Sequence, residues 1–208
     1  MDFKYWENYY SKHNAELVPS LFAQYVSDLL GDRCAEIVEL GCGNGRDSVF
    51  FANKGYSVVA IDQCYNEICF LVKQYQCVEN LDFRCDDFTS MPDDKPYDVV
   101  YSRFTLHSVS KEQQSMTLRW VFRNLKEGGM LCIEVRGQKN EIYGLGEPVE
   151  NDEDAFVYNE HYRRFLKLES LCKELESIGF KIDLSVENKG FAPFNGQDET
   201  YIRVIARR

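Results

Sequence analysis

The fold of this chain is decided by the stretch Glu39-Leu40-Gly41-Cys42-Gly43-Asn44-Gly45. The stretch follows the apolar pair Ile37-Val38 and precedes a segment of helical pattern, residues 47–54. A strand, a glycine-rich turn and a helix in this order let the backbone come very close to a bound nucleoside. We therefore expect a nucleotide-type cofactor at this turn, although a tight turn without any ligand would leave the same pattern.

The glycine spacing distinguishes between classes of cofactor. A nicotinamide or flavin fingerprint is G-x-G-x-x-G, whereas Gly45 comes one residue early and Arg46 fills the dinucleotide position. An acidic residue, Glu39, two positions before the first glycine and then G-x-G-x-G resembles motif I of the class I S-adenosylmethionine (SAM) methyltransferases. This resemblance implies SAM as cofactor and S-adenosylhomocysteine as product, with Gly41, Gly43 and Gly45 beside the methionine and ribose part of the donor.

A second acidic position supports this interpretation. Residues 56–61 are typical of a buried strand that Asp62 ends, 21 residues past Gly41. A strand-helix-strand unit of this length brings a carboxylate beside a ribose. Asp62 could instead cap the helix that follows it.

The third expected strand, residues 81–85, is followed by Asp86, Asp87 and Phe88. In the resembled family, an acidic or polar residue here contacts the adenine amino group and an apolar neighbour flanks the ring. The resemblance implies this role for Asp86 or Asp87, which the sequence does not separate, and for Phe88. Residues 97–102 match the fourth strand of the family, and Ser102 at its end counts among the expected cofactor contacts. The resemblance covers roughly residues 36–136.

The alternation of strands and helices predicts an α/β, Rossmann-like fold. We expect one domain, residues 1–208, with helices on both faces of a seven-stranded, mostly parallel sheet whose last strand is antiparallel. Residues 1–31 are expected to form a helical lid of two helices, and residues 32–208 the SAM-binding core. A substrate loop is expected over 137–165, mobile over 137–160, before a helix over 165–177 and a hairpin of 180–186 with 200–206.

Three residues follow the fourth and fifth strands and are candidates for catalysis: Arg103, His107 and Arg136. Ligands of open α/β sheets lie at the carboxyl ends of the strands. Arginine recognises carboxylate or phosphate through two hydrogen bonds, which favours an anionic acceptor. The arginines could equally neutralise nearby acids such as Glu134. His107 could act as general base or pack as a polar residue at the start of a helix.

Further candidates for acceptor binding come from two other segments. Arg163 and Arg164 follow the acidic loop and could close over the same site or neutralise its carboxylates. Tyr9 is one of several N-terminal aromatic residues that could line the acceptor pocket or belong to the core or lid.

The composition excludes several classes of function. A net charge of −10 over 208 residues argues against nucleic-acid binding, which needs a basic face. The eight cysteines contain no C-x-x-C pair, and the three histidines are far apart, so we expect neither disulfides nor a metal site. The sequence shows no membrane-spanning run and no signal-peptide pattern. These features predict a soluble, cytoplasmic protein, either a monomer or a homodimer.

The residues after the fourth strand narrow the choice of acceptor. An Asn/Asp-Pro-Pro-Tyr/Phe motif, a Pro-Cys pair and an acidic trio for a catechol-type metal are all missing. The chain resembles methyltransferases of bacterial surface-polysaccharide pathways and those of the tellurite-resistance and thiopurine types. We expect methyl transfer to a small, anionic acceptor, such as a sugar or phosphate-bearing intermediate of polysaccharide synthesis. The alternatives are a tellurite/thiopurine-type acceptor, or a SAM-binding partner subunit without turnover.

Overall fold

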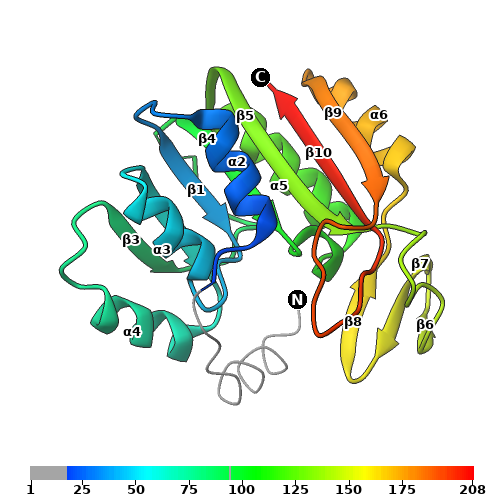
Figure 1. The fold of residues 1–208 in the computed structure, drawn as a ribbon. Coiled ribbons are helices and arrows are strands. Elements are labelled where there is room, and N and C mark those ends of the chain that lie inside the picture. The colour runs from blue at the N-terminus through cyan, green and yellow to red at the C-terminus, as the bar shows by residue number, and fades with distance from the viewer. Residues whose placement is uncertain (1–17, 94) are drawn as a thin grey trace.

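The computed structural model of the protein describes residues 18–93 and 95–208. Its centre is a seven-stranded sheet of order β3-β2-β1-β4-β5-β10-β9 (Figure 1). The strands are β1 (Glu36–Leu40), β2 (Ser57–Asp62), β3 (Leu81–Cys85), β4 (Tyr97–Arg103), β5 (Leu125–Arg136), β9 (Lys181–Asn188) and β10 (Tyr201–Arg207).

The pairing directions confirm the predicted topology. β1 lies between β2 and β4 and is parallel to both. β10, the last strand, is antiparallel to β5 and to β9. The parallel strands therefore end at one edge of the sheet, at the bottom of Figure 1.

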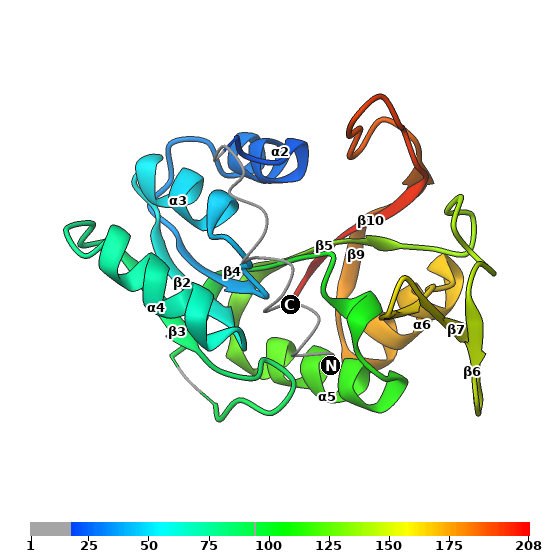
Figure 2. The ribbon, with the colours of Figure 1, turned by 90° about the horizontal axis from the view of Figure 1, so that it is seen from below.

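Helices cover both faces of the sheet, as Figure 2 shows from below. One layer holds α2 (Leu21–Leu30), α3 (Arg46–Asn53) and α4 (Tyr65–Gln74), and the other holds α5 (Lys111–Asn124) and α6 (Leu168–Ile178). Alternate residues of a strand point to opposite faces. Ile37 accordingly packs in the hydrophobic cluster of the first layer, whereas Val38 and Leu40 pack in that of the second.

The N-terminal lid is described in part, because residues 1–17 lie outside the described residues. Its second expected helix is α2, which begins after Ser20, the N-cap residue whose hydroxyl accepts from the Ala23 N–H over 3.0 Å. Phe22, Ala23 and Val26 are fully buried against the sheet. This helix therefore belongs to the packed first layer.

The predicted mobile loop over residues 137–160 is wrong in its central part. Residues 147–164 form a second sheet of three antiparallel strands, β6 (Glu147–Val149), β7 (Asp152–Tyr158) and β8 (His161–Arg164). Aromatic packing stabilises it, with the Phe156 ring 5.6 Å from that of Tyr143 and 6.1 Å from that of Phe165. The many acidic side chains of this segment hide the short period-two pattern. This small sheet lies where the parallel strands end (Figure 1).

The remaining elements agree with the sequence apart from their ends. α6 begins at Leu168 and not at Phe165, because the Leu166 N–H donates to the Arg136 carbonyl at the end of β5. It ends before Gly179, whose φ of 119° places it in the left-handed region. None of the helices in the described part of the chain has the length and apolar character needed to cross a bilayer.

Candidate cofactor and acceptor site

The glycine turn after β1 is anchored to β2. The N–H groups of Gly41 and Cys42 both donate to the Ile61 carbonyl, over 2.8 and 2.9 Å. Gly41, Gly43 and Gly45 have φ values of 73°, 53° and 74°, a conformation that residues with a Cβ rarely adopt. The sequence forms this turn because all three positions are glycine.

Close packing is a second reason for glycine at two of these positions. A Cβ on Gly41 would clash with Cγ2 of Thr105 and lie 3.8 Å from the Phe88 ring. A Cβ on Gly45 would lie 2.9 Å from the Phe83 ring. The turn is therefore in contact with residues of β3 and of the segments after β3 and β4, and Phe88 lies beside it.

Asp62 ends β2 and faces the same turn. Its carboxylate accepts from the N–H of Gly43 and from the N–H of Cys64, both over 2.9 Å. The residue keeps 9% of its surface exposed. An ionised carboxylate has about four acceptor positions, so two remain for other donors. The alternative helix-capping role is realised only in part, because α4 begins after Cys64 and has no side-chain cap.

Glu39 is buried at the end of β1, with 3% of its surface exposed. Its carboxyl group accepts a hydrogen bond from the Ser48 hydroxyl. Burial, together with the negative charge of Asp47, raises the pKa of Glu39 well above its usual value. A cationic group of a ligand at this place would stabilise the ionised form of Glu39.

The two acids after β3 differ in their surroundings. Asp87 is half-buried and accepts from the N–H and the hydroxyl of Thr89, over 2.9 and 2.8 Å. Asp86 is exposed and accepts from the Asp87 N–H over 2.8 Å. Since Asp87 adjoins the buried Phe88, the geometry favours Asp87 over Asp86 as the inward-facing acid.

Ser102 lies beside the glycine turn without facing outward. It is buried at the end of β4, and its register partner is Leu40, the residue before Gly41. Its hydroxyl lies 2.5 Å from that of Thr105. The side chain therefore fixes Thr105 beside Gly41, and only its backbone adjoins the cofactor side.

Arg103 belongs to a buried ionic triad. Its Nε donates to Glu134 over 2.8 Å, and Nε of Arg203 donates to the other carboxylate oxygen over 2.7 Å. Glu134 is fully buried, and burial raises its pKa although both guanidinium groups oppose this shift. Two arginines share one carboxylate, so one positive charge remains in excess within the triad, and the charge of Asp47 adds to that of Glu134 in raising the pKa of Arg103. The Nη1 and Nη2 groups of Arg103 have no hydrogen-bond partner among the described residues.

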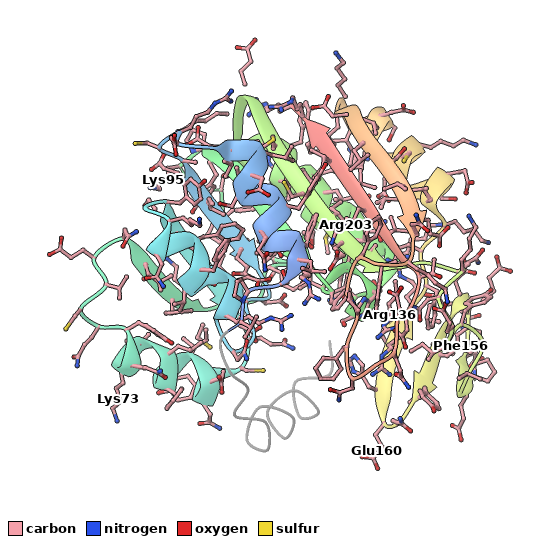
Figure 3. The ribbon with its side chains drawn as sticks, viewed as in Figure 1. Lys73, Lys95, Arg136, Phe156, Glu160 and Arg203 are labelled. Carbon is pink, nitrogen blue, oxygen red and sulfur yellow. The ribbon has the colours of Figure 1, made fainter. Side chains whose placement is uncertain are left out.

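Phe104 was expected at the end of the fourth strand without a role of its own, and Arg203 was not expected near the site. Arg203 interrupts the apolar pattern of β10, which was the available signal, and Figure 3 shows it on that strand. Phe104 has a φ of 58°, and its ring lies 4.0 Å from the Arg103 guanidinium carbon and 4.8 Å from the Tyr201 ring. Strained residues of this kind gather at functional sites.

Arg136, at the end of β5 (Figure 3), is paired with a carboxylate. It donates to Oδ1 of Asn140 over 2.8 Å and forms an ion pair with Glu199, a residue of the β9–β10 loop. Glu199 also accepts from the Tyr201 hydroxyl over 2.6 Å. These contacts match the neutralising alternative for Arg136, with a different carboxylate from the one that the sequence suggested.

His107 lies in the 3-10 helix η1 (Leu106–Ser108), which follows β4. It keeps 3% of its surface exposed, and its Nδ1 has no hydrogen-bond partner among the described residues. Burial and the positive charge of Arg136 hold the pKa of His107 well below its usual value. Its ring centre is 5.9 Å from that of Phe104. The imidazole is therefore neutral, lies beside Phe104 and is close enough to Arg136 to feel its charge.

The two arginines of β8 differ in role. Arg164 is buried and donates to the carbonyls of Val109 and Leu106, over 3.2 and 3.4 Å, and to Oε1 of Gln114 over 2.5 Å. It ties β8 to η1, and this structural role speaks against direct acceptor binding. Arg163 is half-buried and donates to the Tyr158 carbonyl over 2.9 Å. Tyr9 lies outside the described residues.

A groove of about 1250 Å³ lies between the start of α5, α6 and the small sheet. Its lining includes Ser108, Arg164 and the acids Glu150, Asp152 and Glu174. None of the residues around the glycine turn lines it. Among the described residues, no three His, Cys, Asp or Glu side chains form a metal-ligand group, and all eight cysteines are free thiols.

The comparisons with known proteins agree on one family. A family model described as a methyltransferase domain matches residues 8–185. An uncharacterised methyltransferase of Staphylococcus carnosus is 24% identical over 171 residues, which cover 81% of each chain. A thiopurine S-methyltransferase of Legionella pneumophila is 24% identical over 196 residues, 86% of this chain and 88% of that protein.

Comparison with solved structures points to the same kind of fold. The crystal structure of a SAM-dependent methyltransferase from Methanosarcina mazei matches with a TM-score of 0.76 at 22% identity, covering 88% of this chain and 96% of the other. Because the family model spans most of the sequence, this chain belongs to the methyltransferase-domain family, and its fold is that of the class I SAM-dependent methyltransferases.

Proposed function

We propose that the protein transfers the methyl group of SAM to a small, anionic acceptor and releases S-adenosylhomocysteine. The observation that carries this proposal is the glycine turn, whose Gly43 N–H is bonded to the carboxylate of Asp62. The turn has glycine at three of its five positions, and Asp62 keeps free acceptor positions beside it. Both features fit an adenosyl ligand with ribose hydroxyls to donate.

The remaining donor contacts follow from the same geometry. Asp62 would accept from the ribose hydroxyls, and Glu39 would accept from the methionine ammonium, which relieves the cost of its buried charge. Asp87 would accept from the adenine amino group while Phe88 flanks the ring, and Asp86 is the exposed alternative. When bound, SAM supplies a methyl group on a sulfonium, which a nucleophile in line with the bond displaces.

We propose that the methyl acceptor binds next to Arg103. Its triad carries one positive charge in excess, and its two Nη groups are available for a carboxylate or phosphate. Arg136 is paired with Glu199, so we assign it the support of the β9–β10 loop and not acceptor binding. Arg163 remains a candidate for a second contact, as does Tyr9, whereas Arg164 is left out because its donors hold η1.

His107 restricts the kind of nucleophile. Its depressed pKa keeps the imidazole neutral and makes it a weak base. The same positive surroundings would favour the ionised form of an acceptor. We therefore propose that the acceptor atom is ionised or readily ionised when it binds, and that His107 orients it or accepts a weakly held proton.

Two acceptor classes remain in competition. The excess positive charge at Arg103 supports a phosphate-bearing or carboxylate-bearing intermediate, such as one of surface-polysaccharide synthesis. The similarity to a thiopurine S-methyltransferase over most of both chains supports a thiol acceptor. A SAM-binding partner subunit without turnover is disfavoured by Arg103 and His107, which such a subunit would not need. Cytoplasmic localisation, a monomer or homodimer and a lid over residues 1–31 stay predictions.

The experiment that tests the function is acceptor profiling. The protein is incubated with SAM labelled in the methyl group and a cell extract separated by anion exchange, and each fraction is assayed for labelled product and S-adenosylhomocysteine. We expect label in retained, anionic fractions, and its loss with Arg103→Lys at unchanged SAM binding. Label only in unretained fractions would contradict the anionic acceptor, and no label in any fraction would favour the partner subunit.

A further inference from the structure

Asp47 is a buried carboxylate that has no role in the proposed contacts with SAM or with the methyl acceptor. It lies in the first turn of α3, two residues past Gly45, and keeps 3% of its surface exposed. A charge at this depth is costly unless several donors stabilise it. The hydrogen-bond partners of Asp47 therefore show which segments its carboxylate connects.

Three hydrogen bonds reach the Asp47 carboxylate from two other segments. The N–H and the hydroxyl of Ser20 donate to it, each over 2.7 Å, and the Tyr101 hydroxyl donates over 2.9 Å. Ser20 is the N-cap residue of α2, and Tyr101 lies in the centre of the sheet on β4. One carboxylate thus joins the start of α2 and β4 to the helix that begins at the glycine turn.

The three groups that donate hydrogen bonds to Asp47 carry no charge, so these contacts are not ion pairs. Two cations act on Asp47 from further away: the Nε of Arg46 lies at 3.9 Å, and the charge of Asp47 raises the pKa of Arg103. The charge of Asp47 also acts on Glu39, which ends β1 before the same turn and whose pKa it raises. A neutral hydrogen-bonded anchor has a fixed geometry, whereas a distant ion pair tolerates movement.

The glycine turn needs such an anchor because its own backbone is permissive. Gly45, the N-cap residue of α3, supplies no side-chain cap, and glycine backbones have more conformational freedom than any other. Asp47 lies two residues past the turn and has strong tertiary hydrogen bonds to two other elements.

We propose that Asp47 is a positioning residue for the methyl donor. By holding Ser20 and Tyr101 against the first turn of α3, it fixes the conformation in which residues 41–45 receive the donor. This inference rests on the proposed function, because it requires SAM at the glycine turn. Asp47 acts through the turn and does not itself touch the donor.

The test compares SAM affinity in two carboxylate-to-amide variants. Asp47→Asn keeps the size of the side chain but replaces one acceptor oxygen by an NH₂ group, so it cannot accept from the Ser20 N–H and from the two hydroxyls at once. The matched control is Asp98→Asn. Asp98 likewise accepts from a backbone N–H, that of Glu36, and from a side chain, Lys126, but it lies at the opposite end of the sheet. Tyr101→Phe removes a single donor and serves as a milder variant if Asp47→Asn does not fold.

Calorimetry of each folded variant is combined with hydrogen exchange over residues 18–30. We expect SAM affinity to fall at least about tenfold in Asp47→Asn, equivalent to about 1.4 kcal/mol, and about two- to threefold in Tyr101→Phe. Exchange near Ser20 should become faster, while Asp98→Asn should lose stability and keep its SAM affinity.

Two outcomes would overturn the proposal. One is SAM affinity within twofold of wild type in Asp47→Asn and in Tyr101→Phe. The other is an equal loss in Asp98→Asn, which would assign the effect to general destabilisation. Failure of the proposed function is distinguishable, because wild-type protein itself would then not bind SAM.

Discussion

The Gly43 N–H donates to the Asp62 carboxylate over 2.9 Å, so the residue that ends β2 is fixed against the turn that follows β1. The bond brings a buried acceptor group to within contact distance of backbone that carries no side chain. Neighbouring parallel strands place these two residues together although 19 positions separate them in the chain. The proposed binding of the methyl donor depends on this pair.

Removal of the Asp62 carboxylate should weaken the binding of SAM. Charge-assisted hydrogen bonds contribute about 1.5–3 kcal/mol each, so Asp62→Ala should lower SAM affinity at least about tenfold, as calorimetry would measure. Asp32→Ala is the matched control, since that side chain is exposed before β1, belongs to no candidate site and should change the affinity little. Equal affinities in Asp62→Ala and wild type would remove Asp62 from the site.

A methyl group on Gly41 should damage the turn more than one on another left-handed glycine. A Cβ on Gly41 meets Thr105 Cγ2, whereas one on Gly55, with a φ of 88°, meets nothing within 4 Å. Gly55→Ala should cost only the backbone strain, about 1–2 kcal/mol. Gly41→Ala should cost about 1–3 kcal/mol more in a urea-unfolding experiment.

A second substitution, Thr105→Ser, should restore part of the stability that Gly41→Ala loses. Thr105→Ser removes Cγ2 and keeps the hydroxyl that contacts Ser102. The double variant Gly41→Ala/Thr105→Ser should therefore regain part of the lost stability. No recovery would show that the clash with Thr105 is not the cause of the loss.

Arg103 and Arg136 should respond differently to replacement by lysine. The Nη groups of Arg103 have no hydrogen-bond partner among the described residues, and we propose that they bind the acceptor. Arg103→Lys should therefore lose most turnover at near-normal SAM affinity, because lysine lacks the planar fork. Arg136→Lys should instead loosen the loop that carries Glu199 and lower thermal stability. Steady-state kinetics with the acceptor found by profiling separates the two, and full activity of Arg103→Lys would exclude it from acceptor binding.

The buried histidines predict a loss of stability in acid. Burial, with Arg163 and Arg136, lowers the pKa of His161 to about 3, and the pKa of His107 is also well below its usual value. Between about pH 6.5 and 3 the unfolded chain binds protons that the folded protein does not. Stability is therefore full above pH 6.5 and decreases as the pH falls, by up to about 1.4 kcal/mol per pH unit for each histidine.

The measurement is urea unfolding from pH 7 to pH 5. His161→Gln should lower the slope of stability against pH by about one histidine's share, whatever its effect on stability at pH 7. An unchanged slope would mean that His161 is protonated in the folded protein.

The sequence predicted the strands and the glycine turn at the carboxyl end of β1 because short-range rules govern them. Glycine spacing, strand length and the place of Asp62 all lie within one strand-helix-strand unit. The small sheet was missed because Asp152, Glu153 and Asp154 mask its alternation. Its strands are recognised by the packing of Phe156 and Phe165, which no local pattern reveals.

The partners of Arg103 and Arg136 were predicted only in part because these contacts are assembled across the sheet. Arg103, Glu134 and Arg203 come from three strands, and the antiparallel register that pairs Arg203 with Glu134 cannot be read from any one of them. The same holds for Glu199, which reaches Arg136 from a loop 63 residues later.

The central claim is that the glycine turn receives SAM, and calorimetric titration of the wild-type protein with SAM, S-adenosylhomocysteine and NAD tests it most directly. We predict that SAM and S-adenosylhomocysteine each bind at one site per chain, and that NAD releases no heat of binding. Binding of NAD without binding of SAM would contradict the claim.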